Sequence, residues 1–276
     1  MRILFQSLIE TGRIPAYFTG MQQRAATLLR PGATVDFVGM PEGLYGKAVP
    51  SEAVKFPYMA SLTEQIILDN ALRAEAEGYD VFAIGSVQDP ALEQARALVD
   101  IPVVGYGESA MHLACCLSSK FAVLVFQAGF DQMMDLRIER LGLGARALPT
   151  RLIEADFAQI GKGLLDHQSL VEPFTRAAQA AIADGAEAII PGQLYLSEAI
   201  VRSGLNRIDD APIIDGLTAN LKMAEVMHDM KQAGIQVTRR GYTHARPPAD
   251  MVQNARRFQG RHTLPQAAIM RSTPTS

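Results

Sequence analysis

Two polar residues come directly after strand-like apolar runs. Ser86 follows the run 81–85, and Gln193 follows the run 188–190 and a Pro-Gly pair. In open α/β sheets, ligands bind beyond the carboxyl ends of strands, where the next helix offers free backbone N–H groups. A serine there can be a nucleophile, an oxyanion donor or a binding hydroxyl, and a glutamine amide can bond a ligand or only its own turn. We therefore expect Ser86 and Gln193 to lie at a small-molecule site.

Other acids and bases stand near the ends of predicted strands. Glu10 follows the first strand, so it either enters the site or lies in solvent. Glu108 and His112 are four residues apart on a predicted helix, where they can pair, and Glu108 can also serve only to hold its loop. Tyr45 belongs to the Gly- and Pro-rich stretch 39–50, a predicted lid, and is either an anion donor or a structural anchor.

The candidate catalytic residues are therefore Ser86, Glu10, Gln193, Glu108, His112 and Tyr45. Their neighbours along the chain are the expected substrate contacts: Gln6, Ser7, Thr11, Val87, Gln88, Gly192, Leu194 and Tyr195.

Short apolar runs alternate with longer helical patterns, which is typical of βαβ units around a mostly parallel sheet. The runs predicted as strands are 3–7, 34–38, 81–85, 102–104, 121–126, 188–190 and 212–214. Apolar residues three and four apart predict helices at 57–77, 90–99, 108–117, 130–141, 169–184, 194–203 and 217–234. Asp89 is the predicted N-cap of the helix that Pro90 begins.

An internal echo predicts two related halves, because the pattern at 80–86, 100–105 and 111–114 returns at 187–193, 210–215 and 221–225. We expect an α/β fold of two pseudo-symmetric lobes, each a mostly parallel sheet flanked by helices, with the active-site cleft between them. Lobe one comprises residues 1–105 and 216–276, and lobe two comprises residues 106–215. Two lobes suit a chain of 276 residues, since single cores stop growing beyond about 250 residues.

Composition narrows the choice of partner and compartment. The formal net charge of -3 provides no broad positive surface for nucleic acid or for an anionic membrane, so a small molecule is the expected partner. Only two cysteines occur, Cys115 and Cys116, and adjacent cysteines cannot form the spaced disulfide framework of secreted proteins. No apolar run approaches the ~18 residues of a membrane span. We therefore expect a cytoplasmic protein.

Cofactor motifs are missing from the sequence. The residues His167, His228, His244 and His262 lack metal-ligand spacing, and Gly105-Tyr106-Gly107 lacks the third glycine of a dinucleotide-binding loop. We expect no cofactor and no metal, although a metal site assembled from distant residues stays open. The basic stretch 239–246 is expected to be solvated or to contact another subunit.

Two parts of the chain resemble the aspartate/glutamate/hydantoin racemase superfamily, in its hydantoin and allantoin racemase branch. Segments 85–92 and 101–111 are similar to its strand, Asp-Pro turn and Pro-Val-x-Gly-x-x-Glu segment. Segments 189–193, 212–216 and 221–225 are similar to its second catalytic loop and the helix behind it. The resemblance implies a two-lobed, cofactor-independent enzyme that forms a homo-oligomer. It also implies that Ser86 and Gln193 stand where the family has its two catalytic cysteines, and that residues 6–11 replace its Asn-Pro-Asn-Thr-like loop.

These two replacements change the expected chemistry. Serine is a far weaker acid than a thiol and a glutamine amide is no base, so racemisation by paired thiols is excluded at these positions. We expect hydrolysis or elimination of a small carboxylate or a hydantoin-like cyclic amide. Two alternatives remain: an isomerase whose acid/base pair comes from groups such as Glu10, Tyr45 or His112, and a non-catalytic protein that binds the ligand.

Overall fold

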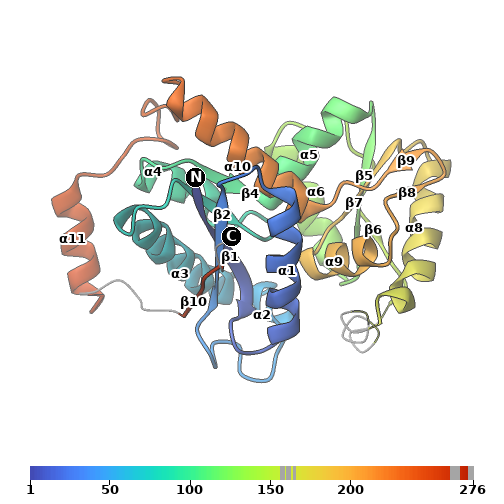
Figure 1. The fold of residues 1–276 in the computed structure, drawn as a ribbon, viewed down its shortest axis with the longest axis horizontal. Helices are drawn as coiled ribbons and strands as arrows, with labels where there is room; N and C mark the ends of the chain where they lie inside the picture. Colours follow the sequence, from blue (N-terminus) through green and yellow to red (C-terminus); the bar gives the residue numbers. More distant parts are fainter. Residues whose placement is uncertain (156–158, 160–162, 164–165, 262–267, 273–276) are drawn as a thin grey trace. The chain divides into compact units, whose positions relative to one another are not determined.

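Contacts between residues divide the computed structural model into two compact units (Figure 1). The structure describes residues 1–155, 159, 163, 166–261 and 268–272. The first unit comprises Met1–Ile84, Pro90–Val104 and Leu221–Ser276, and the second comprises Gly85–Asp89 and Gly105–Asn220. The short loop Gly85–Asp89, which the predicted lobes assign to lobe one, thus belongs to the unit that also contains Gln193.

The first unit is built on a five-stranded sheet with the order β10-β2-β1-β3-β4. β2 and β3 both run parallel to β1, and β10 is antiparallel to β2. The strands are β1 (Arg2–Glu10), β2 (Thr34–Met40), β3 (Val81–Ile84), β4 (Val103–Gly105) and β10 (Ile269–Met270). The predicted strands at 3–7, 34–38, 81–85 and 102–104 are confirmed, whereas β10 was not predicted because two residues carry no periodicity.

The first unit also contains helices. They are α1 (Pro15–Leu28), α2 (Pro50–Val54), α3 (Pro57–Ala76), α4 (Leu92–Leu98), the C-terminal part of α10 (Gly216–Gln232) and α11 (Ala249–Phe258). The sequence patterns did not predict α1, α2 or α11. α1 contains a glycine, two threonines and two aromatic residues, which are weak helix formers, so packing rather than propensity determines it.

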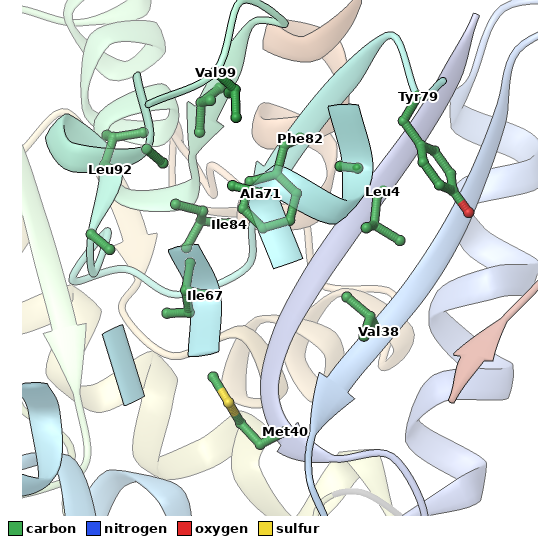
Figure 2. Packing of buried hydrophobic residues seen from close by; sticks show 14 of the residues in the cluster. Leu4, Val38, Met40, Ile67, Ala71, Tyr79, Phe82, Ile84, Leu92 and Val99 are labelled. Carbon is green, nitrogen blue, oxygen red and sulfur yellow. The ribbon is translucent and has the colours of Figure 1, made fainter. Parts of the chain in front are cut away.

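One face of this sheet packs against α3 and α4 in a hydrophobic core (Figure 2). Leu4 and Val38 of the two neighbouring strands point to the same face, and Phe82 joins them from β3. Ile67 and Ala71, one helical turn apart on α3, pack against this face. Alternate residues of the strands and residues one turn apart on the helix therefore form one buried layer.

A C-terminal arm, residues 235–261 and 268–272, extends from α10 along the first unit (Figure 1). Asp100 pairs with Arg239 and Arg246, and Asp69 pairs with Arg256 and Arg261. The basic stretch 239–246 was expected to be solvated or to contact another subunit. Most of these residues are exposed, as expected, and Arg239 and Arg246 also form ion pairs with Asp100 at the surface.

The second unit contains a three-stranded parallel sheet of order β6-β5-β7, formed by β5 (Phe121–Val125), β6 (Arg151–Leu152) and β7 (Ala188–Pro191). Its helices are α5 (Tyr106–Leu117), α6 (Phe130–Arg140), the 3₁₀ helix η1 (His167–Leu170), α8 (Val171–Ala183) and α9 (Leu194–Arg202). The two predicted strands at 121–126 and 188–190 are confirmed. Each is followed by the helix expected after it.

The predicted strand at 212–214 is only partly right. The structure forms a short antiparallel pair of β8 (Arg207–Ile208) and β9 (Ala211–Pro212), and Ile213 makes a single parallel bridge to Ile189. Pro212 has no backbone N–H to donate, so it cannot continue a regular ladder into the main sheet.

No helix in the described part of the chain is long and apolar enough to cross a membrane. The sheets and helices of the two units give an α/β architecture, with parallel sheets flanked by helices. Its strand ends carry the residues that the sequence selected, at Ser86 after β3 and at Gln193 after β7.

Candidate functional site

Ser86 lies in a tight loop between β3 and α4. Its side chain is buried, with 8% of the residue exposed, and its carbonyl oxygen accepts the Asp89 N–H at 3.0 Å. Asp89 and Ala91 both have positive φ angles, 49° and 59°, which are unfavourable for residues with a side chain. The loop therefore holds its shape only because other contacts compensate.

Asp89 is not the N-cap of α4, as the sequence predicted. That helix begins at Leu92 instead of Pro90, after Ala91 in the left-handed region. The Asp89 carboxylate reaches a different helix, accepting the N–H of Gly107 at 2.8 Å and of Glu108 at 2.7 Å in the first turn of α5. The positive φ of Asp89 prevents the extended backbone of an ordinary N-cap, and the free N–H groups of α5 gain an acceptor.

Arg137 of α6 is the third partner of this carboxylate. Its Nη2 lies 3.2 Å from Asp89 Oδ2, and the Asp89 side chain is fully buried. Burial raises the pKa of Asp89 to about 7, although the Arg137 charge and the two N–H groups oppose that rise. Asp89 therefore changes charge near neutral pH.

The first turn of α5 lies very close to the Ser86 loop. A Cβ atom at Gly107 would collide with the carbonyl oxygen of Val87, so only glycine permits this approach. Val87 is buried, and the half-buried Gln88 points its Nε2 at Met133 Sδ, 2.8 Å away. The loop thus has little freedom on either side of Ser86.

The predicted pair of Glu108 and His112 does not form. Glu108 is half-buried at the start of α5, but His112 is exposed and makes no hydrogen bond or ion pair to any residue that the structure describes. One helical turn separates the two side chains, and only the first of them is near a strand end.

Gln193 begins α9 with an extended backbone, at φ -108° and ψ 141°. Only 5% of the residue is exposed, and neither its amide oxygen nor its amide nitrogen has a hydrogen-bond partner among the described residues. Its neighbour Gly192 lies against Leu124 and Val125, so the Gln193 backbone is pressed close to β5. A buried amide with both ends unpaired is costly unless a ligand supplies the missing bonds.

The residues after Gln193 form an apolar wall. Leu194 is buried, and the Tyr195 ring lies 5.4 Å from the Phe126 ring, centroid to centroid. Tyr195 is half-buried. These contacts make both residues part of the packing beneath α9 and leave their predicted role as substrate contacts untested.

Tyr106 connects the Gln193 loop to α5, and the sequence patterns did not select it. Its ring is fully buried, and its hydroxyl donates to the carbonyl oxygen of Pro191, two residues before Gln193. Burial raises the pKa of Tyr106 well above its usual range, so the hydroxyl stays a donor at all ordinary pH values. The ring also fills the space where Gly216 would carry a Cβ.

Asp215 is a second carboxylate that the candidate set did not include. It accepts the N–H groups of Leu217 and Thr218 at 3.2 and 3.1 Å, and the Ser197 hydroxyl at 3.0 Å. It therefore caps α10. An aspartate immediately before a helical pattern is the sequence signal that identifies such a cap.

Glu10 and Tyr45 are brought together in the first unit. Both residues are buried, and the Tyr45 N–H points at Glu10 Oε1, 3.5 Å away. Arg13 Nη1 lies 3.0 Å from Glu10 Oε2. Burial raises the pKa of Tyr45 to about 12, so its phenol remains protonated at neutral pH. Tyr45 also lines a pocket of about 380 Å³, together with residues that include Phe56 and Met59.

The other predicted contacts at the end of β1 are occupied by the protein. Gln6 donates to the Ser7 carbonyl at 2.8 Å and accepts from Asn70 Nδ2 at 2.6 Å. The Ser7 hydroxyl accepts the Ile9 N–H, and the Thr11 hydroxyl accepts the Gly39 N–H. These side chains shape the end of β1, whose last residue is Glu10 and which is longer than the strand predicted at 3–7. Their predicted contact with substrate remains untested.

The described residues contain no group of three or more His, Cys, Asp or Glu side chains placed to hold a metal ion. His262 lies outside the described residues.

Comparison with known proteins identifies the family. A sequence model described as Asp/Glu/Hydantoin racemase matches residues 16–224. The chain belongs to this family. The racemase-family chain is 30% identical to a hydantoin racemase of Rhizobium meliloti over 194 residues, which are 68% of this chain and 72% of that protein. It is 29% identical to a hydantoin racemase of Pseudomonas sp. (strain NS671) over 165 residues, 59% of this chain and 64% of that protein.

Solved structures show the same fold as this racemase-family chain. The allantoin racemase from Klebsiella pneumoniae superposes with a TM-score of 0.71 at 22% identity, covering 90% of this chain and 94% of that one. An allantoin racemase from Pseudomonas fluorescens gives 0.67 at 21% identity, covering 90% and 97%. The predicted superfamily and its α/β fold are therefore confirmed.

Replacing Tyr106 by Phe tests whether the Tyr106 hydroxyl supports the Gln193 loop. The Tyr106→Phe variant leaves the Pro191 carbonyl oxygen buried without its donor, so we expect the free energy of unfolding to fall by about 1–3 kcal/mol. The measurement is urea denaturation followed by fluorescence or circular dichroism. Tyr242→Phe, the same change at a fully exposed position, is the control and should stay within ~0.5 kcal/mol of the original protein. Equal stability of both variants would contradict the role of this hydrogen bond.

Proposed function

We propose that this protein binds a hydantoin-like cyclic amide and interconverts its enantiomers by proton transfer without paired thiols. The observation that carries the proposal is the buried Gln193 amide, whose two ends lack partners in the described structure. The relatives named hydantoin racemase favour this isomerase chemistry over the hydrolysis or elimination expected from the sequence.

Gln193 favours a cyclic amide over a carboxylate because of its two unlike ends. A ring edge with a carbonyl beside an N–H can accept from the glutamine nitrogen and donate to the glutamine oxygen. A carboxylate offers two acceptors, so one of its oxygens would face the lone pairs of the glutamine oxygen. The sequence left both ligand classes open, and the unpaired amide is complementary to the first.

Ser86 is proposed to stabilise the charge that develops when the proton leaves. Removing a proton from the carbon next to a carbonyl group places negative charge on the carbonyl oxygen. A buried hydroxyl donates to that oxygen more strongly than water does, because it is held in place beforehand. Serine needs an adjacent base to act as a nucleophile, whereas it can donate a hydrogen bond without one.

Glu10 and Tyr45 are the proposed proton-transfer groups. A carboxylate can remove the proton, and a phenol that stays protonated can return one. The burial of both residues supports this assignment over His112, which is exposed on α5. Binding without turnover is the second candidate, because the resemblance implies that Ser86 and Gln193 stand where the family has its two thiols.

Replacing Gln193 tests the ligand class. The Gln193→Met variant keeps the length of the side chain but loses both amide bonds, so 5-methylhydantoin should bind roughly 10- to 100-fold more weakly. Isothermal titration calorimetry measures the dissociation constant. Gln179→Met, the same change on the exposed face of α8, should leave it unchanged. Unaltered binding in Gln193→Met, or tighter binding of amino-dicarboxylates than of hydantoins, would contradict the proposed ligand.

Replacing Ser86 tests the proposed oxyanion donor. We expect Ser86→Ala to slow deuterium exchange at C5 of 5-methylhydantoin in heavy water by about 100-fold, the usual cost of removing one such donor. Proton NMR follows the exchange, and a chiral assay follows racemisation. Ser119→Ala, at an exposed position of the same unit, is the control. If the exchange rate of Ser86→Ala is undiminished, Ser86 has no part in the reaction.

Replacing Glu10 tests the proposed base. Glu10→Gln keeps the shape of the side chain but cannot accept the proton, so exchange at C5 should fall below detection while ligand binding persists. Glu77→Gln, which removes a carboxylate paired with Arg73 in the same unit, should exchange normally.

The same spectra separate the three functions. Exchange with loss of optical activity supports the isomerase, and opening of the ring supports the hydrolysis expected from the sequence. Binding of hydantoins with no change in their spectra supports the non-catalytic alternative.

A further inference from the structure

We propose that Asp89 is a positioning residue of this site, whose carboxyl group holds the Ser86 loop against the first turn of α5. The inference rests on the proposed function only in taking Ser86 as a ligand contact. The contacts of the Asp89 carboxylate that support it all lie within the second unit.

The Ser86 loop needs an anchor because its backbone is strained. Asp89 and Ala91 occupy the positive-φ region, where each residue with a side chain costs free energy. Ser86 is tied to Asp89 by the backbone bond from the Asp89 N–H to the Ser86 carbonyl oxygen. Any displacement of Asp89 is therefore transmitted directly to Ser86.

The first turn of α5 supplies that anchor. The Asp89 oxygens accept from Gly107 and Glu108, two of the N–H groups that a helix leaves unpaired at its start. The Val87 carbonyl oxygen occupies the space next to Gly107 that a larger residue would need. The loop is thus held by close packing at Val87 and by hydrogen bonds at Asp89.

The strength of this anchor depends on the charge of Asp89. The ionisable groups that face it are Arg137 on α6, and Glu108 and Tyr106 on α5. Arg137 attracts the charged carboxylate, whereas Glu108 repels it. Because burial raises the pKa of Asp89 to about 7, a fall in pH below neutrality protonates it and removes its attraction to Arg137. The affinity of the site for its ligand should therefore rise with pH through this range.

Two substitutions test the role of Asp89, one at the carboxyl group itself and one at its charged partner. Asp89→Asn removes the titrating group, and Arg137→Met removes the positive charge that lowers its pKa. Asp135→Asn is the matched control, because Asp135 also accepts a backbone N–H, that of Thr150, from a half-buried position in the same unit. The probe is 5-methylhydantoin, titrated calorimetrically between pH 5.5 and 8.5, a range chosen to span about one and a half units around the pKa of Asp89.

We expect the affinity of the original protein and of Asp135→Asn to rise with pH, with a midpoint near pH 7. In Arg137→Met this midpoint should move to higher pH. In Asp89→Asn the pH dependence should disappear. A residue that served only folding would lower stability in both variants without moving this midpoint. A midpoint that persists in Asp89→Asn, or that Arg137→Met leaves in place, overturns the proposal.

A second measurement needs no ligand and covers the case in which hydantoins do not bind. Asp89→Asn has one acceptor oxygen in place of two, so amide hydrogen exchange at Gly107 or Glu108 should accelerate by about tenfold, the factor for one lost hydrogen bond. Exchange at Ser86 should accelerate with it if the loop is released. If exchange accelerates but no hydantoin binds the original protein, the ligand assignment fails and the anchoring role stands. If exchange at these amides is unchanged, the anchoring role itself is wrong.

Discussion

The first turn of α5 is the constraint on which the candidate site of the second unit depends. Three consecutive residues hold two loops: Tyr106 donates to the Pro191 carbonyl, Gly107 leaves room for the Val87 carbonyl, and Gly107 and Glu108 both donate to the Asp89 carboxylate. A helix start can do this because its N–H groups have no partners within the helix. The loops of Ser86 and Gln193 are thus both tied to one short segment at the end of the Pro-Val-x-Gly-x-x-Glu stretch.

In the proposed function, the chemistry of the site follows from the Ser86 hydroxyl and the Gln193 amide. A hydroxyl and a neutral amide cannot exchange protons with carbon near neutral pH, but they can orient a polar ring and stabilise charge on its oxygen. The proposed function therefore assigns proton transfer to Glu10 and Tyr45, which are both buried in the first unit. The fold is shared with racemases, whereas the choice of reacting groups belongs to the proposed function.

The C-terminal arm lies beyond the segment that matches the family, which ends at residue 224. Its anchors are acidic residues of the first unit: Asp36 accepts the Ser272 N–H, Asp69 binds two arginines, and Asp100 binds two more. β10 covers one edge of the five-stranded sheet by pairing with β2. An unpaired edge invites association with other chains, so this pairing protects the sheet.

The sequence by itself determined the elements that its periodicity encodes. Buried strands at 81–85 and 188–190 and the polar residues after them were predictable, because parallel strands and the helices that follow them leave local patterns. The same patterns, with the Asp-Pro turn, were enough to indicate the racemase superfamily. α1 and α11 were missed because their residues have weak helical preference or bury no apolar face.

Tertiary structure alone decided the partners of the buried polar groups. Asp89 reads locally as a cap for the next helix, yet its positive φ turns it toward α5, eighteen residues away. The spacing of Glu108 and His112 allowed the two side chains to pair. In the structure Glu108 is half-buried, whereas His112, one turn later, is exposed. Two features have no local signal: the hydrogen bond of Tyr106 to Pro191, and the lack of a partner for the Gln193 amide among the described residues. Such contacts join residues distant in the chain, and their energies depend on burial, which only the packed fold defines.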